Sequence, residues 1–179
     1  MAHRVIIRNL AATALTVAAL GVLGWSPAGA PSKIAGTFAL KYAEQHPLPV
    51  PDANGHVLLL GRVQGANRST GPTEYMDQAN VTNLEFADLV QGNGPHQGYI
   101  TMSRGADTAI TQWSGKVTTT LSPQKTPITT FEGTWNKVKG TGRYQGVTGR
   151  GAYKGRFTSK TEYVVDWTGQ ISGGALAEK

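Results

Sequence analysis

Alternation of apolar and polar residues is the dominant pattern of the chain after residue 31. Large apolar side chains occupy every second position from Phe38 to Tyr42, and the same period returns from Tyr163 to Trp167. A period of two is typical of a β-strand with one buried face. Read this way, the sequence predicts strands at 34–42, 56–67, 75–90, 99–104, 108–121, 128–138, 151–158 and 162–171. A short helix within 76–90 is the alternative for the third of them.

Prolines and glycines mark the predicted connections. Three prolines between residues 44 and 51 predict an extended loop, and Asn54-Gly55 is a strong hairpin signal. Residues 91–98 read as a loop, and 105–107 as a short turn. Eight antiparallel strands in one domain usually close into a barrel or pack as a sandwich. We predict an all-β fold, a single eight-stranded antiparallel β-barrel.

A glycine-rich stretch precedes the last predicted hairpin. Glycines stand at 140, 142, 146, 149, 151 and 155, and each costs about 1 kcal/mol relative to alanine inside a helix. Glycine-rich loops that bind phosphate open a helix. Here the following residues, from Tyr153 through Phe157 to Trp167, keep the period of a strand. The stretch therefore predicts a tight corner between strands, and no nucleotide site.

The first thirty residues have the three parts of a secretory signal. Arg4 and Arg8 precede an apolar run at 10–25, and the small residues Ala28 and Ala30 follow it. We expect cleavage after Ala30 and a secreted or periplasmic bacterial protein. A retained membrane anchor of about 20 apolar residues is the alternative. The predicted organisation is a signal peptide at 1–30, the barrel at 31–171 and a flexible tail at 172–179.

Composition narrows the chemistry. The chain of 179 residues has no cysteine, which excludes disulfides and thiol catalysis. Its formal net charge is +6, and the charged residues are scattered along the sequence, so we expect no nucleic-acid partner. His46, His56 and His96 lack the spacing of metal ligands and read as polar residues of loops or strand starts. We therefore expect no metal and no cofactor. A Gly-x-Ser-x-Gly elbow is absent, which disfavours a hydrolase.

The predicted inner face of the barrel is rich in aromatic residues. An eight-stranded barrel is of the size at which side chains fill the interior or leave space for one small ligand. Both outcomes remain open, because an aromatic set of this kind is often a packed core. The inward-facing set also includes Leu40, Val117 and Val165. The candidate ligand-binding residues are Phe38, Leu58, Leu60, Trp113, Phe131, Trp135, Tyr163 and Trp167.

Glu85 is the candidate for acid–base chemistry. On one long strand it would share a face with Asp77, while Asp88 would take the other face. A carboxyl group that points into an aromatic barrel has its pKa raised by desolvation, which suits general acid–base catalysis. The alternative is a solvent-exposed carboxylate or an ion pair with Arg62 or Arg104, as for most strand carboxylates.

The segments from Gly140 to Gly149 and from Ser159 to Gly169 resemble the allene oxide cyclase barrel. That calycin-like fold is close to the plant dirigent proteins. The resemblance implies a small trimer-forming barrel whose apolar cavity folds and cyclises a reactive fatty-acid epoxide. The cavity cysteine of that group has no counterpart in this chain. Glu85 and Tyr163 would be the catalytic residues that orient the substrate.

Three functions follow, in order of preference. The first is an exported barrel that binds a small apolar or aromatic molecule without catalysis. The second is a cyclase or isomerase of the allene oxide cyclase type, and the third is a structural envelope protein. A homo-oligomer, either a trimer or a dimer, is left open.

Overall fold

Eight strands account for most of residues 30–173, the part of the chain that this computed structural model describes. Their bounds are β1 Ser32–Pro49, β2 His56–Ser69, β3 Asn80–Val90, β4 Gly94–Arg104, β5 Asp107–Leu121, β6 Pro127–Thr141, β7 Thr148–Phe157 and β8 Glu162–Ser172. One 3₁₀ turn, η1 (Gly142–Tyr144), follows β6. The predicted all-β, eight-stranded fold is confirmed.

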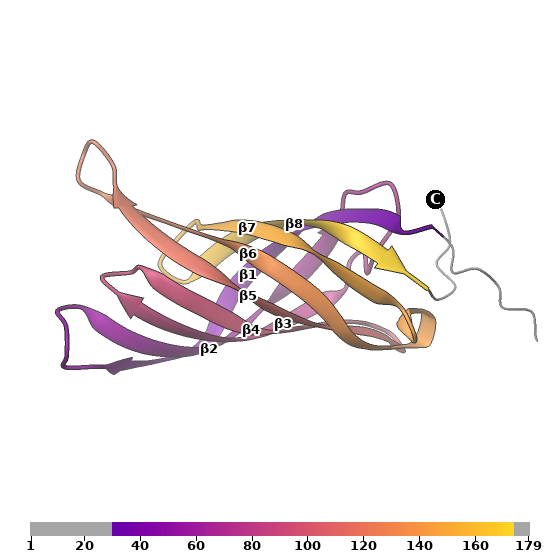
Figure 1. Cartoon of the computed structure of the whole chain (residues 1–179), viewed down its shortest axis with the longest axis horizontal. Helices are drawn as coiled ribbons and strands as arrows, with labels where there is room; N and C mark the ends of the chain where they lie inside the picture. The colour runs from indigo at the N-terminus through magenta and orange to yellow at the C-terminus, as the bar shows by residue number, and fades with distance from the viewer. Residues whose placement is uncertain (1–29, 174–179) are drawn as a thin grey trace, which may run out of the picture.

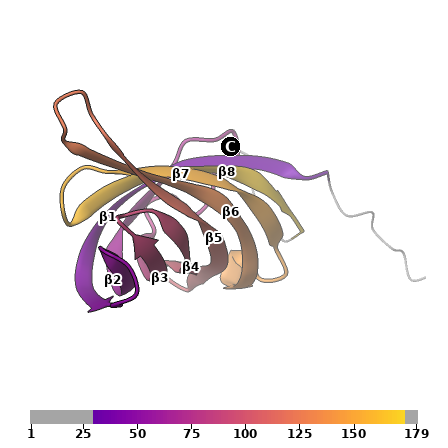
Figure 2. The same cartoon turned by 60° about the vertical axis from the view of Figure 1, so that its left-hand side comes forward.

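The sheet closes on itself as an up-and-down barrel (Figures 1 and 2). Each strand pairs antiparallel with the next, and β8 returns to pair with β1 from Ser32↔Ile171 to Lys41↔Glu162. The turns at 50–55, 91–93, 122–126 and 158–161 lie at one end of the barrel, called here the mouth. The connections at 70–79, 105–106 and 142–147 lie at the other end, called here the floor.

The predicted loop at 44–51 is wrong, because β1 continues to Pro49. Pro47 pairs with Leu59 of β2, although the pairing of β1 with β8 ends at Lys41. A proline has no N–H to donate, so it is tolerated where a strand has a neighbour on one side only. The β1–β2 hairpin therefore extends beyond β8 at the mouth.

Two further boundaries differ from the prediction around β3. The strand begins at Asn80, so Asp77 lies in the preceding loop and does not share a strand with Glu85. The predicted loop at 91–98 shrinks to residues 91–93, where Gln91 and Gly92 take positive φ angles of 51° and 74°. The alternative helix at 76–90 does not form.

The loop 70–79 folds across the floor as a plug. Tyr75 and Met76 are each only 2% exposed, and Met76 adopts a positive φ of 49°. The Asn67 side-chain amide donates to the carbonyls of Tyr75 and Met76 at 3.0 and 2.7 Å. The Met76 amide in turn donates to the hydroxyl of Tyr144 at 2.9 Å. These bonds satisfy buried backbone groups that no strand partner serves.

Large rings lie directly over glycines of β7. A Cβ atom at Gly155 would lie 2.1 Å from the Phe131 ring, and one at Gly151 would lie 2.6 Å from the Trp135 indole. The predicted corner is located at 142–147, before β7. Gly151 and Gly155 therefore make room for aromatic side chains inside the barrel.

Leu58 and Leu60 do not point inward, which corrects their assignment. Leu60 is 57% exposed on the outer face, where it lies opposite Phe86 of β3. Leu59 takes the inward position, on the same face as the fully buried Val63. In the continuous apolar run 57–60, only residues further along the strand reveal which parity faces the core.

The proposed signal at 1–30 lies outside the described residues except for Ala30, and the proposed tail lies outside them except for 172–173. Between residues 30 and 173, no helix has the length and apolar character needed to cross a membrane.

Candidate functional site, the barrel cavity

A cavity of about 810 Å³ occupies the barrel interior. Its wall extends from residues of the mouth turns, such as Gly92 and Ser159, down to Tyr75 of the plug. All the predicted aromatic candidates lie on this wall, whereas Leu58 and Leu60 do not. The aromatic candidates on the wall are Phe38, Trp113, Phe131, Trp135, Tyr163 and Trp167. The interior is therefore open, and its volume is within the range of about 300–1,000 Å³ typical of ligand pockets.

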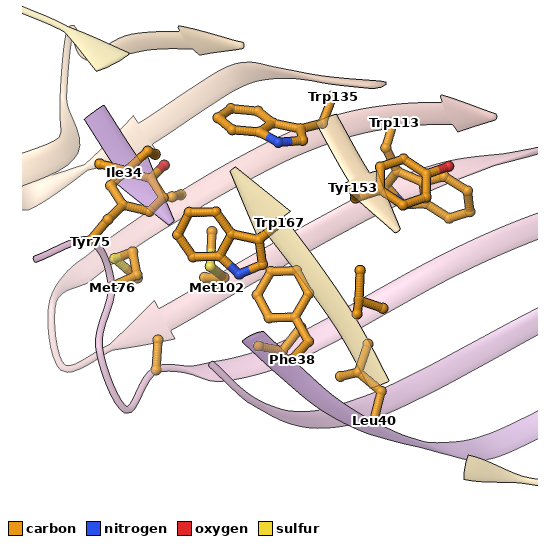
Figure 3. Close-up of a cluster of buried hydrophobic side chains, with 14 of the residues drawn as sticks. Ile34, Phe38, Leu40, Tyr75, Met76, Met102, Trp113, Trp135, Tyr153 and Trp167 are labelled. Atoms are coloured by element: carbon orange, nitrogen blue, oxygen red, sulfur yellow. The ribbon is translucent and has the colours of Figure 1, made fainter. Parts of the chain in front are cut away.

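The deep end of the cavity is formed by apolar side chains from distant strands. Trp167 lies beside Phe38 and Tyr75, with ring centroids 5.8 and 5.9 Å away (Figure 3). Met76 and Met102 belong to the same buried cluster. The Trp167 indole N–H donates to Oδ1 of Asn67 at 3.1 Å. The same asparagine anchors the plug, so the Trp167 ring and the floor share one support. A ligand at this end would meet an apolar surface that is held in place.

Glu85 lies halfway along the wall and points inward. Its Oε1 accepts a hydrogen bond from the hydroxyl of Tyr42. Its Oε2 accepts bonds from the Tyr163 hydroxyl at 3.0 Å and the Asn83 amide at 2.9 Å. Neither Arg62 nor Arg104 is its partner, since these bind Glu44 and Glu74. The sequence left open whether Glu85 points inward or is exposed at the surface, and in the structure it points inward.

Burial raises the pKa of Glu85, and the hydrogen bonds from Tyr42, Tyr163 and Asn83 partly offset this rise. The same burial raises the pKa of the Tyr42 and Tyr163 hydroxyls, and the nearby carboxylate adds to the effect. Both phenols therefore remain protonated donors at neutral pH. The Glu85 carboxyl group can exchange a proton with a bound molecule, or it can bind a positively charged group of that molecule.

Asn83 and Tyr42 complete this cluster and were not among the predicted site residues. Asn83 accepts a bond from the Trp113 indole N–H at 2.9 Å and donates to the Tyr163 hydroxyl at 3.0 Å. Both residues carry a signal in the sequence. Asn83 stands two positions before Glu85, and Tyr42 four positions after Phe38, so each shares the parity of an inward residue.

His96 and Tyr153 form a second polar pair on the cavity wall. The Tyr153 hydroxyl lies 3.0 Å from Nε2 of His96. Burial lowers the pKa of His96 to about 4, with a small opposing effect from the Glu132 backbone. The imidazole is therefore neutral at pH 7. The loop position predicted for His96 is wrong, because it lies within β4 and is 9% exposed.

The other two histidines of residues 30–173 lie outside the cavity. Nδ1 and Nε2 of His56 lie 2.5 and 2.7 Å from Asp52 and Asp88, and the pKa of His56 is raised by both carboxylates. His46 is exposed on β1. Within residues 30–173, no three or more histidine, aspartate or glutamate side chains are grouped so as to hold a metal ion.

Comparisons with known proteins concern only the fold of this chain. No family model matches the chain, and no curated protein matches it. A solved protein of unknown function from the DUF3224 family of Shewanella oneidensis is 14% identical, with a TM-score of 0.43, over 83% of this chain and 100% of that one.

Two pterocarpan synthase dirigent proteins are also similar in structure. GePTS1 is 14% identical with a TM-score of 0.44, over 92% of this chain and 100% of its own. PsPTS1 is 13% identical with a TM-score of 0.43, over 84% and 99%. The motif itself resembles the allene oxide cyclase barrel, a fold that is close to the dirigent proteins. At these values the likeness concerns the barrel alone.

Proposed function

We propose that this barrel binds a small apolar or aromatic molecule in its interior. The observation that supports the proposal is the cavity of about 810 Å³ with aromatic walls, a closed floor and a mouth between hairpins. A ring-containing ligand in the cavity would remove apolar surface of both the ligand and the cavity wall from water. This burial favours binding by roughly 25 cal/mol per Å² of apolar surface. The polar groups of Glu85 and His96 would orient that ligand, as a few fixed polar groups do in most pockets.

The test uses a neutral fluorescent probe, N-phenyl-1-naphthylamine, whose emission rises in an apolar site. Ala87 lies on the cavity wall and is 5% exposed, so Ala87→Trp places a large side chain inside the barrel. We expect the wild-type protein to bind the probe and Ala87→Trp to lose most of that affinity. Leu84 is on the same strand but 52% exposed on the outer face, which makes Leu84→Trp a matched control.

Two results would count against cavity binding. One is a wild-type protein that leaves the probe emission unchanged. The other is equal probe affinity in Ala87→Trp, Leu84→Trp and wild type, which would place the probe on the surface. The folded state of each variant is checked by circular dichroism, because overpacking a core commonly costs about 1–3 kcal/mol.

A second candidate function is a cyclase or isomerase, and the position of Glu85 favours it. A buried carboxyl group flanked by the Tyr42 and Tyr163 hydroxyls is suited to proton transfer to or from a folded substrate. The cavity would supply the near-attack shape. We expect a fatty-acid allene oxide, generated in place, to give a cyclised product of one handedness with the wild-type protein. A racemic product, or turnover unchanged in Glu85→Gln and Tyr163→Phe, would rule this candidate out.

A further inference from the structure

Within residues 30–173, Glu85 has no positively charged partner. Among the described residues that line the cavity it is the only carboxylic acid. None of the ion pairs within 4.0 Å among residues 30–173 includes it. The two cationic side chains on the lining, Arg156 and Lys160, are exposed at the mouth. His96 is neutral at pH 7 because burial lowers its pKa to about 4.

The hydrogen bonds around Glu85 suit the ionised carboxylate. The Tyr42 hydroxyl donates to one oxygen, and the Tyr163 hydroxyl and the Asn83 amide donate to the other. A carboxylate offers about four acceptor positions, so three donors leave about one position free. Glu85 is of intermediate exposure and lies on the cavity wall, so a molecule in the cavity can reach that position.

Aromatic rings gather around Tyr163, one of the two tyrosines that bind Glu85. The ring of Tyr163 is 5.8 Å from that of Tyr42, 5.3 Å from that of Phe131 and 5.4 Å from that of Phe157, centroid to centroid. The faces of such rings attract cations, and the attraction is strongest where water is excluded. The carboxylate and the rings thus favour the same kind of charge.

We propose that the natural ligand is an apolar amine or another organic cation, with its charged nitrogen on Glu85 and its apolar part along the aromatic wall. This inference rests on the proposed function, because it names the class of molecule that the cavity takes. The ammonium group would complete the set of donors on the carboxylate. The remaining volume, down to Trp167 and Met102, would bury the apolar part.

The experiment compares three molecules with one skeleton, 4-phenylbutylamine, 4-phenylbutanol and 4-phenylbutyrate, as competitors of N-phenyl-1-naphthylamine. At about pH 8 the amine is protonated, and hydrogen bonds to charged groups are strong enough to predict about tenfold tighter binding than the alcohol. We expect Glu85→Gln to remove that preference while the alcohol binds as before. Glu132→Gln, which removes an exposed carboxylate of the outer face, should keep the preference.

The pH dependence gives a second measurement that needs no variant. Besides Glu85, the titratable side chains on the lining, among the described residues, are Tyr42, Tyr75, Tyr153, Tyr163 and His96, with Arg156 and Lys160 at the mouth. The four phenols stay neutral, since burial raises the pKa of each. His96 stays neutral above its pKa of about 4. We therefore expect the preference for the amine to shrink as the pH falls through the raised pKa of Glu85.

Each outcome separates the two proposals. If the alcohol displaces the probe as well as the amine does, the organic cation is wrong and the apolar binding site stands. If the butyrate binds best, Glu85 acts as a neutral acid and the cation is again wrong. If neither the probe nor any of the three molecules binds, both the cation and the binding function are wrong. Should Glu85→Gln fail to fold, the pH dependence of the wild-type preference decides alone.

Discussion

The Tyr163 hydroxyl donates a 3.0 Å hydrogen bond to Oε2 of Glu85, across the barrel interior and across 78 positions of the sequence. Tyr163 is on β8 and Glu85 on β3, with β1 and β2 between them in the sheet. Tyr42 of β1 donates to the other carboxylate oxygen. The carboxyl group thus links β3 to β1 and β8, neither of which pairs with β3 in the sheet.

Tyr163→Phe should raise the pKa of Glu85 further, because the variant loses a donor that favours the ionised form. The variant should also lose about 1–2 kcal/mol of stability at neutral pH, since a buried acceptor is left with fewer partners. Carbon-13 NMR of the glutamate carboxyl groups measures the pKa directly. Tyr99→Phe, at a tyrosine that is 48% exposed, is the control and should change neither quantity. A lowered pKa of Glu85 in Tyr163→Phe would contradict the hydrogen-bond network.

His96 should make the folded state less stable at acid pH. Its pKa falls from an ordinary 6.5 to about 4 on folding, so between these values the unfolded chain binds the additional proton. The resulting stability is fully present above about pH 6.5 and falls as the pH drops, by about 2 kcal/mol between pH 7.5 and pH 5.

Urea unfolding of the wild type and of His96→Gln at these two pH values isolates this contribution. His56 and Glu85, whose pKa values are raised, change stability in the opposite sense but are common to both proteins. The wild type should therefore lose more stability on acidification than the variant. Parallel losses in the two proteins would show that His96 does not titrate as a buried neutral group.

Asn67 should be critical for the floor of the cavity. Its side chain is 2% exposed and serves the Trp167 indole and the carbonyls of Tyr75 and Met76. Asn67→Ala leaves the Trp167 indole N–H and the Tyr75 carbonyl without these partners, while the Met76 carbonyl keeps the Ala79 amide, and this should cost about 2–4 kcal/mol of unfolding free energy. Limited proteolysis should then cut within the loop 70–79. Asn136→Ala, on the exposed outer face, is the control and should resist the protease like the wild type. If Asn67→Ala resists the protease equally well, Asn67 does not hold the loop 70–79 in place.

The sequence predicted the fold because period-two alternation is a local property of each strand. It could not assign the inward parity of the run 57–60, since four consecutive apolar residues carry no alternation. It also misplaced His96, because Gly94 and Pro95 suggest a loop although they begin β4.

The candidate site was predictable only in part. The aromatic wall follows from alternation alone, and so does the possibility that Glu85 points inward. The choice between an inward and an exposed Glu85 depends on Tyr42 and Tyr163, which lie 43 and 78 positions away and meet it only when the barrel closes. A cavity, likewise, depends on how side chains from all eight strands fill the interior.

Export is testable at the N-terminus. When the full chain is expressed in a bacterium, we expect the periplasmic protein to begin at Pro31, since Ala28 and Ala30 form a small-residue cleavage site. Intact mass spectrometry of the periplasmic extract measures this to the residue. Ala30→Arg should leave the full-length chain uncleaved. A wild-type protein that keeps its first thirty residues would favour the membrane anchor.

The glycines of β7 should be costly to replace where a ring lies over them. A Cβ at Gly155 would lie 2.1 Å from the Phe131 ring, which contacts Tyr163 and Phe157 and has little room to shift. Gly155→Ala should therefore lower the unfolding free energy by about 3 kcal/mol, as overpacking does in a tight core. Gly105 provides the comparison, because its Cβ would meet nothing within 4 Å and only its φ of 59° opposes alanine. Gly105→Ala should therefore cost only about 1 kcal/mol. Equal urea midpoints for the two variants would contradict this prediction, because they would mean that the Phe131 ring moves aside to make room for the added methyl group.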